Sequence, residues 1–217
     1  MIVRARGRSG PAVVLVHGGP GAPGEMGPLA RALEDRFRVL EPFQREDGDA
    51  PITVARHVED LREVVASLGS DARPAVVGHS WGAMLALAFG AAHPDAASRI
   101  ALIGCGTFDP GSRARFREEI ARRGGPDLPR RTAEADAIEN ADARLRARAA
   151  ALEPLYFVDP ISTDTGLDHV SERAHRESWE DMLRLQAEGV YPAAFATIVR
   201  PVLMLHGADD PHPGPAI

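Results

Sequence analysis

The chain has 217 residues, 44% of them hydrophobic, which is enough for one large α/β domain with a buried core. Its formal net charge of −6 argues against nucleic acid or an anionic membrane surface as a partner. A single cysteine, Cys105, excludes an internal disulfide and a cysteine-rich metal site. The short polar N-terminus lacks the apolar segment of a signal peptide, and no apolar run approaches membrane-spanning length. We therefore expect a cytoplasmic protein.

The first part of the chain alternates between short apolar runs and helical patterns. Residues 11–16 form a continuous apolar run, which is typical of a strand buried on both faces of a parallel sheet. The sequence then predicts a helix over 26–36 and a strand over 37–40. A second helix begins after Thr53 as N-cap and is ended by Gly69. This alternation predicts a mostly parallel sheet with helices on both faces.

A stretch with a sharp turn follows, over residues 75–87. A β-branched strand leads through Gly-His-Ser-Trp-Gly at 78–82 into an alanine-rich helix. A serine on such a strand-to-helix turn has an exposed hydroxyl, and the N–H groups at the start of the helix point toward it. Gly78 and Gly82 lie where a side chain would collide across the turn. The pattern predicts that Ser80 is a nucleophile; a serine that merely turns a loop is the alternative.

A glycine loop, His17-Gly18-Gly19-Pro20-Gly21, follows the first apolar strand and lets backbone N–H groups approach a ligand closely. Residues 100–103 are predicted to form a further buried strand. Functional loops of such sheets gather at the carboxyl ends of the strands. We therefore expect the glycine loop and the turn over residues 78–82, called the nucleophile turn below, to lie at the same edge.

The pattern changes to arginine, alanine and glutamate after residue 106. Helices are predicted over 113–123, 132–152 and 171–188. We interpret this block as a helical insertion that lies over the strand ends, after which the sheet resumes. The predicted organisation is a first part of the core over 1–106, a helical cap insertion over 107–194, and a second part of the core over 195–217.

Together these motifs resemble the α/β-hydrolase fold family, and the His-Gly-Gly-Pro-Gly stretch at 17–21 resembles its proline iminopeptidase-like branch. The resemblance covers essentially the whole chain outside the inserted helices. It implies an α/β fold with a mostly parallel sheet, helices on both faces and a helical cap insertion, and it implies no cofactor and no metal. The last helix and strand of the family are expected to be missing from this chain.

Acyl transfer requires a nucleophile, an oxyanion hole, a base and a group that orients the base. The N–H of Trp81, which follows Ser80, is predicted to supply one oxyanion donor. The resemblance favours Gly19 for the second donor, with Gly18 as the second choice. It also matches Gly207-Ala208-Asp209-Asp210 to the pattern that carries the acid, so Asp210 is preferred and Asp209 competes.

The base is the missing part, because the histidine of the family lies beyond the acid and this sequence ends before reaching it. His212 is too close to Asp210 in sequence to be the natural match, and His79 is expected to pack structurally. We expect a truncated form of a longer hydrolase that catalyses poorly, or else a natural short form whose base comes from elsewhere or is absent. An open sheet edge would make the chain marginally stable or a homo-oligomer.

The resemblance also suggests a substrate-binding set of Gly18, Trp179 and Glu180. In proline iminopeptidases a cap glutamate after paired tryptophans holds the α-amino group of a peptide, and Trp179-Glu180 matches the end of that pattern. One apolar anchor and one solvated charge on an amphipathic helix explain these residues equally well. The expected partner is a small-molecule ester or amide, or a short peptide. The rival function is a non-catalytic binding protein on the same fold.

Overall fold

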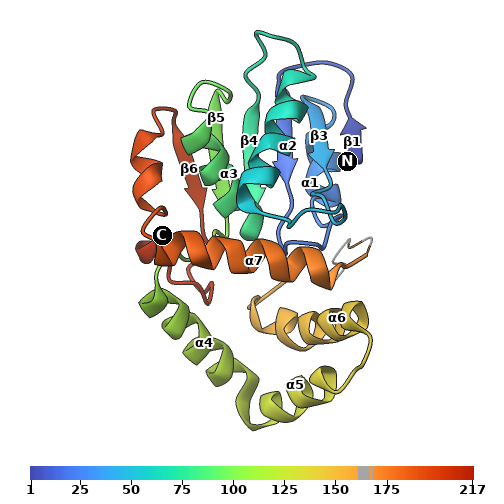
Figure 1. Cartoon of the computed structure of the whole chain (residues 1–217), viewed down its shortest axis with the longest axis vertical. Coiled ribbons are helices and arrows are strands. Elements are labelled where there is room, and N and C mark those ends of the chain that lie inside the picture. The colour runs from blue at the N-terminus through green and yellow to red at the C-terminus, as the bar shows by residue number, and fades with distance from the viewer. Residues whose placement is uncertain (161–166, 168) are drawn as a thin grey trace.

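The computed structural model describes residues 1–160, 167 and 169–217. Its centre is a six-stranded sheet in the order β1-β3-β2-β4-β5-β6 (Figure 1). The strands are β1 (Val3–Arg6), β2 (Ala12–Val16), β3 (Arg38–Pro42), β4 (Ala75–His79), β5 (Arg99–Ile103) and β6 (Val202–Leu205). Every neighbouring pair is parallel except β1 with β3. The predicted α/β architecture with a mostly parallel sheet is thus confirmed.

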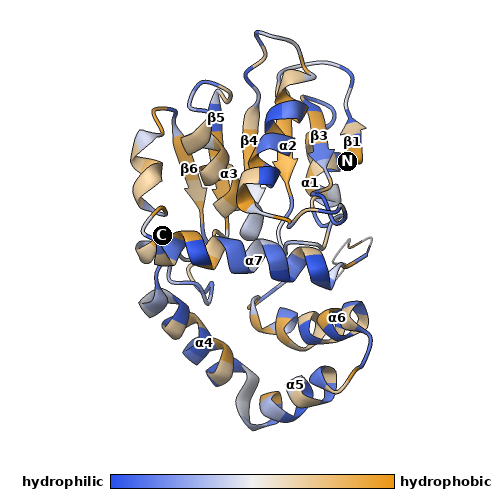
Figure 2. Ribbon diagram, viewed as in Figure 1, coloured by the Kyte–Doolittle hydropathy of each residue, from blue (hydrophilic) through white to orange (hydrophobic). Residues whose placement is uncertain are grey.

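Both faces of the sheet are covered by helices. Side chains alternate along a strand, so Val14 and Val16 of β2 face one core cluster while Val13 and Leu15 face the other. The first cluster packs against α2 (Val54–Ala66) and α3 (Trp81–Ala92), and the second packs against α1 (Gly27–Leu33). Figure 2 shows the apolar residues concentrated in the strands and in α3.

In the first part of the chain, one predicted helix is shorter than expected and one strand was not predicted. The helix predicted over 26–36 is limited to α1, because the backbone N–H groups of Arg36 and Phe37 bond to the Leu33 carbonyl in a turn that leads into β3. The strand β1 was not predicted. Its residues alternate between apolar and charged, and only antiparallel pairing with β3 gives them strand structure.

The described residues between β5 and β6 contain four α-helices: α4 (Pro110–Gly124), α5 (Leu128–Asp136), α6 (Ala141–Leu152) and α7 (Glu172–Ala187). The single helix predicted over 132–152 is wrong, since α5 ends at Asp136 and the Asn140 side chain caps a new helix by accepting from the Ala143 N–H. Figure 1 shows α7 lying across the carboxyl ends of the strands, with α4, α5 and α6 forming an arc beyond it. Short 3-10 turns, η1 (Gly125–Asp127), η2 (Glu153–Leu155), η3 (Ala193–Thr197) and η4 (Gly214–Ala216), complete the described elements.

Helix α7 is tied to the start of α2. Its Asp181 carboxylate accepts the Val54 N–H at 2.8 Å, and its Glu177 carboxylate accepts the Ile52 N–H at 2.8 Å. Val54 is the first residue of α2, so its N–H has no partner within the helix, and Ile52 lies just before the Thr53 N-cap. The carboxylates therefore complete α2 and fix α7 over the site edge of the sheet.

The outer strand β6 is exposed along its whole length. Val202, Leu203, Met204 and Leu205 are 44%, 57%, 38% and 52% exposed, although all four are apolar. The strand pairs with β5 on one side only. Among the described residues, no helix is long and apolar enough to cross a membrane.

Candidate active site

The backbone at Ser80 has the geometry that a nucleophile on a sharp turn requires. Its φ and ψ are 50° and −116°, and it is the one non-glycine residue with positive φ in the described part of the chain. A Cβ on Gly78 would lie 2.2 Å from the Gly82 carbonyl oxygen, and one on Gly82 would lie 2.1 Å from the Val16 carbonyl oxygen. The two glycines are thus required by close backbone approach. Such strain in a non-glycine residue costs about 1–3 kcal/mol and persists only where surrounding structure enforces it.

His17 fixes the glycine loop from within the protein. Its Nε2 accepts the Gln44 N–H at 3.1 Å, so Nδ1 must carry the proton and donate to the Gly18 carbonyl oxygen at 2.9 Å. Burial lowers the pKa of His17, which favours this neutral form. These contacts give His17 a structural role at the end of β2.

The same contacts distinguish the two candidate oxyanion donors. The Gly18 N–H already donates to the Glu25 carboxylate at 2.5 Å. The Gly18 carbonyl and the Gly19 N–H belong to one trans peptide and point in opposite directions, so His17 orients the Gly19 N–H as well. Gly19 has a φ of +42°, and its N–H makes no hydrogen bond among the described residues. The geometry favours Gly19 over Gly18.

Trp81 follows the nucleophile turn as the first residue of α3, so its N–H has no partner within the helix. The indole Nε1 donates to Gln44 Oε1 at 2.8 Å, and Gln44 Nε2 donates to the His17 carbonyl oxygen at 2.8 Å. Gln44 therefore connects the glycine loop to the nucleophile turn. Sequence reasoning missed it, although its position just after β3 places it at the site edge.

Trp179 of α7 meets the Trp81 ring edge-to-face, with centroids 6.2 Å apart. On the same helix, Ser178 Oγ lies 2.8 Å from His57 Nε2, and the His57 ring packs against Trp81 at 6.3 Å. Burial lowers the pKa of His57 to about 4, so the ring is neutral at pH 7. Trp179 thus lies next to the residue that follows Ser80.

Glu180 is in a different environment. Its side chain is 65% exposed and lies 3.8 Å from Arg176. This is the solvated charge of the alternative interpretation, and its role in binding an α-amino group stays a prediction.

Asp210 is placed after β6 and is surrounded by histidines. Its Oδ1 lies 3.0 Å from His212 Nδ1, and its Oδ2 lies 3.5 Å from His206 Nε2. Burial would raise the pKa of Asp210, but hydrogen bonds from the His212 side chain and backbone lower it overall. The neighbouring Asp209 instead uses its carbonyl oxygen to accept from Arg123. Asp210 is thus the acid with an imidazole partner.

The pair of Asp210 and His212 does not reach the nucleophile through any contact in the described residues. The His212 ring stacks on Phe116, with centroids 4.2 Å apart. Within residues 1–160, 167 and 169–217, no histidine makes a hydrogen bond to the Ser80 hydroxyl. The source of the base for Ser80 therefore stays a prediction.

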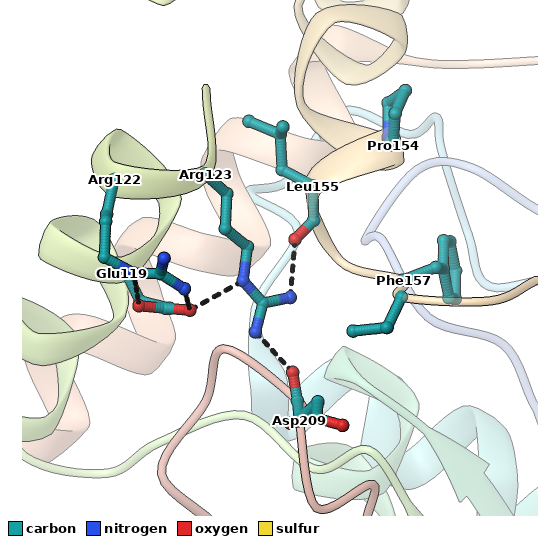
Figure 3. A pocket seen from close by; sticks show the side chains of 8 residues that line it. Glu119, Arg122, Arg123, Pro154, Leu155, Phe157 and Asp209 are labelled. Carbon is teal, nitrogen blue, oxygen red and sulfur yellow. Dashed lines mark hydrogen bonds and ion pairs between the residues drawn. The ribbon is translucent and has the colours of Figure 1, made fainter. Parts of the chain in front are cut away.

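An open cavity of about 450 Å³ lies beside the Asp209–Asp210 turn (Figure 3). Arg123 on its wall bonds to Glu119, to the Leu155 carbonyl and to the Asp209 carbonyl. Its apolar wall comes from Pro154, Leu155, Phe157 and Val158. Helix α4 and the chain after α6 thus form a hollow next to the turn that carries the acid.

Comparison with known proteins identifies the class. The chain belongs to the alpha/beta hydrolase family, whose profile matches residues 13–217. A cis-3-alkyl-4-alkyloxetan-2-one decarboxylase of Shewanella oneidensis is 26% identical over 107 residues, which are 46% of this chain and 34% of that protein. A soluble epoxide hydrolase of Corynebacterium sp. strain C12 is 34% identical over 100 residues, which are 44% of this chain and 35% of that protein. Each match spans about a third of the relative's own length.

Solved structures share the fold. The epoxide hydrolase VrEH1 of Vigna radiata superimposes with a TM-score of 0.62 at 19% identity, over 95% of this chain and 76% of that one. An alpha/beta hydrolase of Sphaerobacter thermophilus gives a TM-score of 0.58 at 24% identity, over 97% and 79% of the two chains. These similarities support a hydrolase fold and do not single out the proline iminopeptidase-like branch.

Proposed function

We propose that this protein is a serine hydrolase that cleaves an ester or amide bond through an acyl-enzyme on Ser80. The observation that carries the proposal is the positive φ of Ser80 between two glycines whose Cβ positions are blocked by backbone. The fold does not need a strained serine there for its own sake, whereas a nucleophile must project from the turn.

In this proposal the Ser80 hydroxyl attacks the substrate carbonyl and the bond to the leaving group breaks after proton transfer. The N–H groups of Trp81 and Gly19 stabilise the developing oxyanion. A base must take the hydroxyl proton and return it to the leaving group, and Asp210 is the residue that would orient this base. Because no histidine among the described residues makes a hydrogen bond to the Ser80 hydroxyl, we expect acylation to be detectable and turnover to be slow.

Carboxylate-nucleophile chemistry is not proposed, even though a curated relative is a soluble epoxide hydrolase. Position 80 carries a hydroxyl, which cannot form the alkyl-ester intermediate that an aspartate forms. Within serine hydrolysis we favour a small ester or amide over an aminopeptidase substrate, because Glu180 is mostly exposed and pairs with Arg176.

A fluorophosphonate probe tests the nucleophile directly. We expect labelling of the wild type and none of Ser80→Ala. Ser67→Ala is a matched control, because its hydroxyl ends α2 by donating to the Val64 carbonyl and it should label normally. Absence of labelling in the folded wild type would overturn the proposal in favour of a binding protein.

The substrate class is tested with p-nitrophenyl acetate and an aminoacyl p-nitroanilide. We expect the ester to be cleaved faster, with Glu180→Gln leaving KM for both substrates within about twofold, as for an exposed side chain. A large rise in KM for the aminoacyl substrate alone would instead support the aminopeptidase interpretation.

A further inference from the structure

A single carboxylate oxygen bridges the glycine loop and the nucleophile turn. Glu25 Oε1 lies 2.5 Å from the Gly18 nitrogen and 2.7 Å from His79 Nδ1. The Glu25 side chain is 21% exposed, so it is largely enclosed by the protein. It enters the site from the turn before α1, outside every motif that the sequence singled out.

Each of the two residues that Glu25 contacts immediately precedes a group with a role in the proposed reaction. Gly18 immediately precedes Gly19, the favoured oxyanion donor, and His79 immediately precedes Ser80. A donor must lie within about 0.5 Å of its productive position to stabilise the oxyanion. One anchor shared by both segments fixes their separation.

We propose that Glu25 is a positioning residue whose carboxylate holds the oxyanion donor of the glycine loop in register with the nucleophile turn through Gly18 and His79. This inference rests on the proposed function. His17 holds the Gly18 carbonyl and Glu25 holds the Gly18 N–H, so together they fix the peptides on both sides of that residue.

Charge favours the same arrangement. Burial would raise the pKa of Glu25, but the hydrogen bonds from His79 and Gly18 lower it overall. Burial likewise would lower the pKa of His79, but its hydrogen bond to Glu25 raises it overall. Glu25 and His79 therefore form an ion pair near neutral pH.

Three other ionisable groups face this pair. His17 from the end of β2 acts on Glu25, the turn after β6 brings Asp210 toward His79, and η2 places Glu153 within the field of Glu25. Asp210 Oδ2 and His79 Nε2 would lie 3.4 and 3.8 Å from a Cβ on Gly104, so both border the same small space. The positive charge on His79 is thus stabilised by Glu25 and, at longer range, by Asp210.

The first test measures the rate of fluorophosphonate labelling of Ser80, a step that needs no deacylation. Glu25→Gln keeps the size of the side chain and removes its charge, and we expect labelling to slow about tenfold, part of the 10²–10³ that a lost oxyanion donor costs. Glu34→Gln is the matched control, because that carboxylate lies at the C-terminal end of α1, contacts Arg6 at 3.4 Å and should leave the rate unchanged. An unchanged rate in folded Glu25→Gln would overturn the proposal.

The second test follows the His79 ring by NMR titration in a Ser80→Ala background, which separates it from hydrolase activity. Glu25→Gln should lower the titration midpoint of His79, because it removes the carboxylate that raises the pKa of that ring. An unmoved midpoint would overturn the proposal, whereas an unlabelled wild type with a shifted midpoint would overturn only the hydrolase function.

If Glu25→Gln does not fold, Glu25→Asp carries the labelling test. The shorter carboxylate keeps the charge but cannot reach Gly18 and His79 together, so labelling should again slow. A wild-type rate in Glu25→Asp would count against positioning.

Discussion

Ser80 directly follows β4 and Asp210 lies in the turn after β6, and these two strands differ in how they are packed. β4 pairs with strands on both sides and continues into α3, whose side chains are almost all buried. β6 pairs on one side and exposes all four of its residues. Ser80 is consequently held by close backbone packing, whereas Asp210 is held by local contacts to two histidines. Close backbone packing therefore makes the nucleophile turn rigid, whereas the position of Asp210 depends on its side-chain contacts.

The largest effect is expected at the nucleophile turn itself. Gly82→Ala places a methyl group 2.1 Å from one backbone oxygen and 2.5 Å from another, and backbone cannot move aside as a side chain can. We expect a loss of about 4 kcal/mol or more in the free energy of unfolding, measured by urea denaturation. Gly27→Ala, whose nearest contact would be 3.6 Å, is the control and should be nearly neutral. Equal midpoints for the two variants would contradict the rigid turn.

The same substitution, Leu to Ala, in the neighbouring strands β5 and β6 compares the packing of the inner sheet with that of its edge. Leu102 of β5 is buried and Leu203 of β6 is 57% exposed. Leu102→Ala should cost about 3 kcal/mol of unfolding free energy, because it leaves a cavity. Leu203→Ala should cost less than about 1 kcal/mol. A large loss for Leu203→Ala would mean that β6 is covered in solution.

The next effect depends on pH. The folded pKa of His57 is about 4, below its ordinary value of 6.5, so the unfolded chain binds more protons between those limits. The contribution of neutral His57 to the free energy of unfolding is complete above pH 6.5. It decreases as the pH falls, by about 2 kcal/mol at pH 5.

Urea unfolding at pH 7 and pH 5 checks this sign. His57→Gln should remove most of that pH dependence, while His169→Gln, with His57 intact, should keep it. A wild-type slope in His57→Gln would exclude His57 as the source.

The smallest effect is expected at Asp210. Its folded pKa lies below 3.8, so its contribution to stability is complete above that value and is lost as pH falls through the folded pKa. The carboxylate is partly solvated, so Asp210→Asn should reduce the difference in unfolding free energy between pH 5 and pH 2.5 by less than about 1 kcal/mol. An increase in that difference would show that the His212 contact does not stabilise the carboxylate.

The features that could be predicted from the sequence are those encoded by neighbouring residues, and the features that were missed depend on distant contacts. The parallel strands, the glycine loop and the turn at Ser80 are encoded by contiguous residues, so periodicity and motif spacing were sufficient to predict them. Gln44 and Glu25 act on residues 27 and 54 positions away, through contacts that no local pattern reports. β1 needed its partner β3, and the break between α5 and α6 needed the capping role of Asn140 to be noticed in an otherwise continuous helical pattern.

The hydrogen bonds between the α7 carboxylates and the chain at the start of α2 also determine when that region can complete its folding during synthesis. The N–H groups of Ile52 and Val54 wait for acceptors that lie 125 and 127 residues further along the chain. Closing so long a loop is costly before other contacts form. The Val54 N–H at the start of α2 therefore gains its acceptor only after the ribosome has synthesised α7, and a nascent chain that stops short of Asp181 lacks that acceptor.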